Sequence, residues 1–125
     1  MGKLIVKKFG GTSVADAERI EAVADNIESE ILKGNKVTVV LSAMGESTDD
    51  LIKLAKEINP EPDLREYDAL VSTGEQISVA LLAMALLKRD IKGKSYTAYQ
   101  LGIKTNSSHS RARILDVDVS KITSE

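Results

Sequence analysis

The sequence predicts an α/β fold with a largely parallel sheet, and two observations support this prediction. Short apolar runs alternate along the chain with longer segments of helical periodicity, which is the order of strands and crossover helices in a parallel sheet. The β-branched apolar run "VTVVL", residues 37–41, is typical of a strand that is buried on both faces. The chain has 125 residues, which is enough for one domain with a real core.

The first part of the chain is predicted to form a strand, a helix and a second strand. Residues 3–9 are predicted to form a buried strand, and residues 37–41 form the second one. Thr12 or Ser13 is expected to cap the helix between them, and Gly34-Asn35 ends it. Its apolar residues recur at helical steps: Val14, Ala17, Ile20, Val23, Ala24, Ile27 and Ile31.

The rest of the chain is predicted to contain two helices and two short strands. The helices cover residues 49–58 and 64–89, and both prolines lie in the turn between them. The run "ISVALLAMALL" is apolar nearly all round, so we expect the longer helix to pack against the sheet and against another subunit. A strand is expected at Ser95 to Tyr99, and a short strand or hairpin at Ala112 to Val119.

Composition excludes several classes of function. The 17 basic and 19 acidic residues give a net charge of −2, which argues against nucleic acid or a membrane surface as a partner. Cysteine is absent, so disulfides and thiol chemistry are excluded. Neither a membrane-spanning apolar run nor a signal peptide is evident, so a cytoplasmic protein is expected.

The segment "KKFGGTSVA", residues 7–15, predicts an anion site where a strand turns into a helix. Gly10 and Gly11 let the backbone approach a ligand, and the helix start presents N–H groups and its positive dipole end. Lys8 adds a positive charge, and Thr12 and Ser13 add hydroxyl donors. A tight turn with a solvated lysine remains the alternative. Neither the Walker loop nor the Rossmann fingerprint is present.

The loop "SAMGESTDD", residues 42–50, has a similar design after the second strand. Neighbouring parallel strands would place both loops at one edge of the sheet, where ligands bind in such folds. The alternative is a simple helix cap formed by Ser47, Thr48 or Asp49.

The segment "LVSTGEQIS", residues 70–78, interrupts the apolar helix with polar residues. Gly74 costs a helix about 1 kcal/mol relative to alanine. An unpaired Glu75 carboxylate among apolar neighbours is also unfavourable. The compensating partner is either a ligand ammonium group or a cation of the chain, Arg65 or Lys88. The single histidine, His109, has no second histidine or cysteine with which to form a metal site, and it is expected in a loop.

Together, these segments resemble the aspartate kinase family within the amino acid kinase superfamily. The resemblance rests on "KFGGTSVA", "VVLSAMGESTDDLI", "DALVSTGEQISVALLAMAL" and "GIKTNSSHSRARILDVD", in this order. It implies a three-layer α/β/α sandwich and the transfer of a phosphoryl group from ATP, with Mg²⁺, to L-aspartate, giving 4-phospho-L-aspartate. It also implies roles for individual residues. Lys8 contacts the transferring phosphate, and Phe9, Gly10, Gly11, Thr12, Ser13 and Ser42 surround the phosphates; Thr48 and Glu75 bind aspartate.

The resemblance covers only part of the family pattern. The "RGGSD"-like segment, the nucleotide-binding loops and the ACT region of the family are absent, and Asn106 replaces an aspartate of many members. Residues 1–125 are therefore expected to be the amino-terminal portion of a kinase domain, inactive alone, that self-associates or binds a missing second half. An anion-binding or assembly half-domain, and a kinase with another carboxylate acceptor, remain the alternatives.

Overall fold

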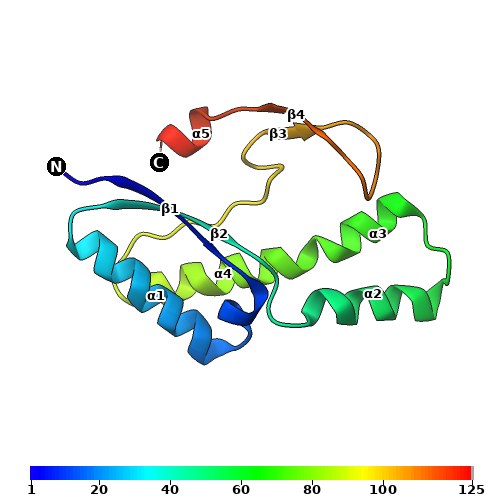
Figure 1. The fold of residues 1–125 in the computed structure, drawn as a ribbon, viewed down its shortest axis with the longest axis horizontal. Coiled ribbons are helices and arrows are strands. Elements are labelled where there is room, and N and C mark those ends of the chain that lie inside the picture. The colour runs from blue at the N-terminus through cyan, green and yellow to red at the C-terminus, as the bar shows by residue number, and fades with distance from the viewer. Residues whose placement is uncertain (125) are drawn as a thin grey trace.

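The computed structural model describes residues 1–124. Figure 1 shows the arrangement of the elements. In chain order they are β1 (Leu4–Phe9), η1 (Gly11–Val14), α1 (Ala17–Leu32), β2 (Lys36–Leu41), α2 (Ser47–Ile58), α3 (Leu64–Val71), α4 (Thr73–Leu87), β3 (Ile103–Thr105), β4 (Ile114–Val117) and α5 (Ser120–Ser124).

The strands form two separate pairs. β1 and β2 are parallel, in a register that runs from Leu4 opposite Lys36 to Phe9 opposite Leu41. β3 and β4 form an antiparallel hairpin. The predicted α/β class with a parallel sheet is therefore confirmed, and a short strand lies within residues 112–119 as expected.

The strand predicted at Ser95 to Tyr99 is wrong. This segment has no strand partner among the described residues, and Thr97 forms hydrogen bonds within a local turn. The Thr97 amide donates to Gln100 Oε1 over 2.9 Å, and the Leu101 amide donates to the Thr97 carbonyl over 3.1 Å. A strand needs hydrogen bonds to a neighbouring strand, whereas these bonds close a turn.

One face of the β1–β2 sheet carries the core. α1 packs against α4 and β2, and α4 also contacts β2. The buried cluster consists of Val14, Ile20, Val23, Ala24, Ile27, Leu41, Leu82, Ala85 and Leu86. Arg89 ties the two helices together, because its guanidinium forms 2.6 Å contacts with both Glu21 and Asp25 of α1.

The other face of the sheet is exposed. Leu4 and Val6 of β1 are 71% and 67% exposed, and Val40 of β2 is 48% exposed. The expectation that residues 37–41 are buried on both faces is therefore wrong for the described part of the chain. Alternate residues of a strand point to opposite faces, and α1 and α4 cover the same one. The β3–β4 hairpin lies on the opposite side of the sheet from α1 (Figure 1).

The helix predicted at residues 64–89 is divided into α3 and α4 at Ser72. The Ser72 hydroxyl donates to the Ala69 carbonyl over 2.9 Å, and the Thr73 hydroxyl donates to the Leu70 carbonyl over 2.7 Å. Such side-chain bonds compete with the helical ladder and bend helices. Residues 64–87, taken across this break, are long and apolar enough to span a membrane. The core helix of a soluble protein can meet the same criterion of length and composition.

Candidate functional site

The two glycine-containing loops meet at the carboxyl ends of β1 and β2, as the sequence predicts. The Gly45 amide donates to the Gly11 carbonyl over 2.9 Å. A Cβ added to Gly11 would lie 3.0 Å from the Ala43 carbonyl oxygen and 3.1 Å from that of Gly45. A side chain at Gly11 would press on the backbone of the second loop, so glycine favours this close approach of the two loops.

Gly10 is different, because nothing in the chain requires glycine there. Its φ of −77° and ψ of 172° are extended values that most residues adopt, and an added Cβ would meet no atom within 4 Å. Gly10 therefore faces open space beside the packed Gly11. This space leaves room for a ligand to approach the backbone.

The start of α1 corrects one prediction. Thr12 and Ser13 lie in the short helical turn η1, and the Ser13 amide donates to the Gly10 carbonyl over 3.0 Å. Neither residue caps α1. The cap is Asp16, whose side chain accepts a 2.9 Å hydrogen bond from the Arg19 amide. The pattern of apolar residues could not separate η1 from α1, because Val14 and Ile20 both pack into the core.

Adjacent lysines of β1 have different surroundings. Lys7 points toward α1, where its ammonium donates to Asn26 over 2.6 Å and to Glu30 over 3.3 Å. The Glu30 pKa is lowered, chiefly by a hydrogen bond from Asn35 and then by the bond from Lys7. Lys8 is exposed on the opposite face of the strand, and within residues 1–124 its ammonium forms no ion pair or hydrogen bond. Of the two cations, Lys8 is the one available to a ligand.

The second loop is attached to α4 through a residue that the sequence analysis did not single out. Ser78 is fully buried, and its hydroxyl donates to the Ser42 carbonyl over 2.8 Å. Ser78 is the one polar side chain in its buried turn of α4, which is the signal that could have identified it. The bond fixes Ser42 at the first turns of α4.

The alternative role predicted for the second loop, a simple side-chain cap for the following helix, is not found at the start of α2. Its N-cap position is Glu46, and no side chain makes a capping hydrogen bond there. Among the described residues, the Ser47 hydroxyl oxygen is the one buried side-chain polar atom without a hydrogen-bond partner. Thr48 is half-buried in the next position. The hydroxyls of this segment are thus not used to start the helix.

Gly74 brings the start of α4 against the second loop. A Cβ added at Gly74 would lie 2.9 Å from the Ala43 Cβ and 3.9 Å from the Ser47 hydroxyl oxygen. This close approach explains a glycine in a helix, where it lowers stability by about 1 kcal/mol relative to alanine. Glu75 is the next residue of α4 and therefore follows directly on this contact with the second loop.

Arg65 and Lys88, the two cations predicted as alternative partners of Glu75, do not contact it. Arg65 pairs with Glu66, and Lys88 pairs with Glu21 of α1 over 2.6 Å. Within residues 1–124 the Glu75 side chain, which is half-buried, forms no hydrogen bond or ion pair. A carboxylate in this position is available to a cationic ligand.

His109 and Asn106 both organise the β3–β4 turn. His109 Nδ1 lies 3.5 Å from an Asp68 carboxylate oxygen on α3. Asn106 Oδ1 accepts hydrogen bonds from the Ser108 and Arg113 amides, both at 3.2 Å. An aspartate could accept the same two bonds, so this role does not depend on the side chain being an amide.

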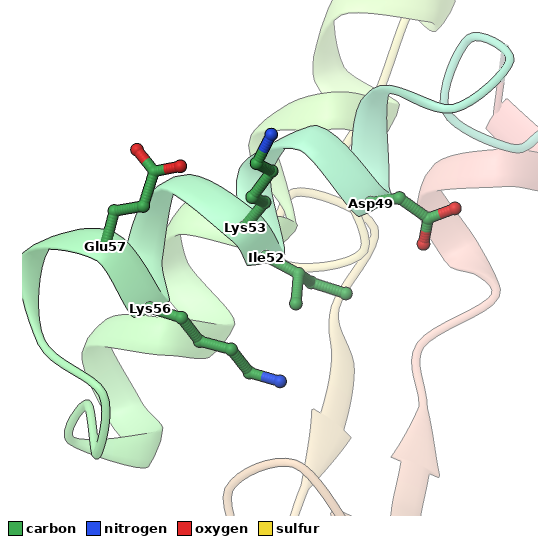
Figure 2. Close-up of a pocket in the computed structure, with 5 residues that line it drawn as sticks. All are labelled: Asp49, Ile52, Lys53, Lys56 and Glu57. Carbon is green, nitrogen blue, oxygen red and sulfur yellow. The ribbon is translucent and has the colours of Figure 1, made fainter.

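A surface hollow runs along α2, beginning at Asp49 near the end of the second loop. Figure 2 shows its lining residues, Asp49, Ile52, Lys53, Lys56 and Glu57, all on one side of α2. Mixed charges on a single helix surface do not provide a set of converging groups. In the described part of the chain, no group of three or more His, Asp or Glu residues could hold a metal ion.

Residues 3–124 match the amino acid kinase family, so the chain belongs to this family. It is 52% identical to an aspartokinase of Geobacillus stearothermophilus over 119 residues, which are 95% of this chain and 29% of that protein. It is also 52% identical to an aspartate kinase of Pseudomonas putida over 122 residues, 98% of this chain and 30% of that protein. The chain thus spans about 30% of the length of these relatives.

Solved structures agree with this assignment. Aspartate kinase from Synechocystis superposes with a TM-score of 0.67 at 57% identity, over 70% of this chain and 15% of that one. E. coli aspartokinase III, solved with aspartate and ADP, superposes with a TM-score of 0.74 over 97% of this chain and 36% of that one. At 24% identity, the second match supports the fold alone.

Proposed function

We propose that this chain supplies the acceptor and phosphate side of an aspartate kinase, which transfers a phosphoryl group from ATP to the side-chain carboxylate of L-aspartate. The product would be 4-phospho-L-aspartate. The observation that carries the proposal is the meeting of the two loops and the start of α4 at one edge of the sheet. The names of relatives about 50% identical over nearly the whole chain support the choice of substrate.

On the phosphate side, Lys8 would contact the transferring group with its free ammonium. Backbone N–H groups around Gly10 and Gly11, together with Thr12 and Ser13, would hold the phosphate oxygens. Phe9 and Ser42 would complete this side, since the Ser42 amide donates to the Phe9 carbonyl over 3.1 Å and so joins the ends of the two strands. Positioned cations and N–H groups are what phosphoryl transfer requires of a protein.

On the acceptor side, Glu75 would bind the α-ammonium group and Thr48 would donate a hydrogen bond to a carboxylate. The attacking carboxylate has an ordinary pKa of about 3.9, so it is ionised at neutral pH and needs no general base. The described residues offer no carboxylate cluster for Mg²⁺. Within the described residues, stabilisation of the negative charge would therefore rest on Lys8 and on backbone and hydroxyl donors, while Glu75 binds the ammonium group.

Titration of the purified 125-residue chain with L-aspartate, followed by NMR, tests the acceptor side directly. We expect wild type to bind and Glu75→Gln to lose roughly tenfold or more in affinity, because a charged hydrogen bond is removed. N-acetyl-L-aspartate, which lacks the ammonium group, should not bind. Glu57→Gln removes an exposed carboxylate of α2 and serves as the control. Equal binding by wild type and Glu75→Gln would contradict the proposed role.

A second assay tests the reaction. ATP, Mg²⁺ and L-aspartate are incubated with the chain, and hydroxylamine traps any aspartyl phosphate. We expect no turnover by this chain alone, because it spans about 30% of its relatives. A signal that disappears in Lys8→Ala would show that the chain is sufficient.

We also infer that the chain associates with itself or with a second part of the enzyme. The outer side of α4 presents Ile77, Leu81, Met84 and Leu87, which are 38–63% exposed. Contiguous exposed apolar surface of this kind marks an interaction site. A monomer in sedimentation velocity at high concentration would contradict self-association. The cytoplasmic location expected from the sequence stays a prediction.

A further inference from the structure

The β3–β4 hairpin is attached to the rest of the chain mainly at its two ends. At its base, the Asp118 amide donates to the Gly102 carbonyl over 3.4 Å, and the Lys121 ammonium donates to the Gln100 carbonyl over 2.7 Å. At the other end, its turn, residues 106–113, reaches α3 (Figure 1). We call these residues the hairpin tip. Apart from Asn106, every residue from 104 to 124 is exposed.

One carboxylate holds the hairpin tip on α3. Asp68 accepts hydrogen bonds from the Ser110 amide over 2.7 Å and from the Ser110 hydroxyl over 3.0 Å. His109 Nδ1 lies 3.5 Å from the same carboxylate. The Ser110 amide is the main reason that the Asp68 pKa lies below its usual value. Within residues 1–124, the hydrogen-bond and ion-pair partners of the Asp68 side chain all belong to the tip.

The tip is shaped for this contact. Ser110 has a φ of 62°, in the left-handed region that residues other than glycine, asparagine and aspartate seldom adopt. The two bonds that Asn106 Oδ1 accepts, together with the Asn106 amide bond to the Arg113 carbonyl over 3.1 Å, close the turn around it. A strained backbone that persists indicates that surrounding contacts require it. Here the strain lets both donors of Ser110 reach Asp68.

The attachment point lies close to the candidate acceptor site. Asp68 and Glu75 are seven residues apart on the α3–α4 segment, which corresponds to two helical turns and about 10 Å along the axis. Ser72 between them keeps right-handed helical angles, so the two side chains leave similar sides of the segment. The tip also carries Arg111 and Arg113, which form no ion pair within residues 1–124. The hairpin tip therefore carries two arginines without an ion-pair partner in the described part of the chain.

We propose that Asp68 is a positioning residue that fastens the hairpin tip beside Glu75 and thereby raises the affinity of the site for a dicarboxylic amino acid. This inference rests on the proposed function, because it takes Glu75 as the group that binds the ligand ammonium. The arginines of the tip supply positive charge for the ligand carboxylates. Release of the tip would leave Glu75 in place and remove that charge.

The experiment uses the 125-residue chain with L-aspartate as the probe, and measures Ser110 amide exchange, the dissociation constant and the thermal midpoint. For Asp68→Ala we expect Ser110 exchange to accelerate and aspartate affinity to fall, each roughly tenfold, because a charged acceptor is lost. The thermal midpoint should change little, since the hairpin buries few apolar side chains. Asp68→Asn keeps one acceptor oxygen and should lie between Asp68→Ala and wild type.

Asp116→Asn is the matched control, since it removes a carboxylate of β4 whose recorded partner is Lys104 at 4.0 Å. It should leave both exchange and affinity unchanged. Unchanged Ser110 exchange in Asp68→Ala would overturn the attachment. Faster exchange with unchanged aspartate affinity would overturn the positioning role while leaving the proposed function intact. If folded wild type does not bind L-aspartate, the proposed function fails, and the positioning role fails with it.

Discussion

Replacing Gly74 with alanine tests the contact that joins α4 to the second loop. The added Cβ would lie 2.9 Å from the Ala43 Cβ and 3.8 Å from Leu51 Cδ1. The Ala43 Cβ is held by the backbone and is buried, so it cannot rotate away. Alanine would gain about 1 kcal/mol of helix propensity, whereas overpacking costs typically about 1–3 kcal/mol. We expect a net loss of stability of up to about 2 kcal/mol.

Urea unfolding followed by circular dichroism measures this change, and a double-mutant cycle isolates its cause. Ala43→Gly removes the opposing Cβ, so Gly74→Ala in that background should regain stability through helix propensity alone. The coupling energy between the two sites should exceed about 1 kcal/mol, as for residues in direct contact. A stabilising Gly74→Ala in the wild-type background, or additive effects of the two changes, would refute the reasoning.

Three further predictions concern the helix ends and the junction between α1 and α4. Asp16→Ala should lower the unfolding free energy by about 1 kcal/mol, because the α1 cap is lost; urea unfolding measures it, and no change would contradict the capping role. Ser47→Ala removes a buried hydroxyl that lacks a partner, so the unliganded chain should become more stable, by about 1 kcal/mol in the same assay. The third prediction is a pH dependence. Lys88 first, and then Arg89, lower the Glu21 pKa below 4.5, so this contribution to stability is complete above pH 4.5 and is lost as the pH falls through the lowered pKa. Thermal unfolding from pH 6 to pH 3 should therefore show a smaller loss in Glu21→Gln than in wild type.

The positions of β1, β2 and α1 could be predicted because their signals are local. The apolar run of residues 37–41 and the three- and four-residue steps before Gly34 depend only on neighbours in the chain. The start of α1 was missed for a physical reason. The cap of α1 lies at Asp16 rather than at Thr12 or Ser13, and the apolar pattern passes through the short turn η1 without a break.

The partners of charged side chains could not be predicted. From the sequence, an ion pair between Glu75 and Arg65 or Lys88 was one of two possibilities. In the structure, Arg65 pairs with Glu66 and Lys88 pairs with Glu21. The sequence indicated Lys8 as the cation of the anion site, but it did not predict that Lys7 would bind α1 through Asn26 and Glu30. Ion pairs depend on which helices pack together, and Glu21 of α1 lies 67 positions from Lys88 along the chain.

The sequence by itself determined the α/β class, the family and the two loops that follow parallel strands, because periodicity and short glycine segments are local properties. Only the tertiary structure decided how these loops fit together. Gly11 lies against Ala43, Gly74 lies against the same residue, and Ser78 holds the Ser42 carbonyl. The structure also decided that one face of the β1–β2 sheet is exposed within the described residues, because α1 and α4 both pack on the other face. These features depend on contacts between segments that are distant in the chain, and hydrophobic pattern alone does not encode which segments meet.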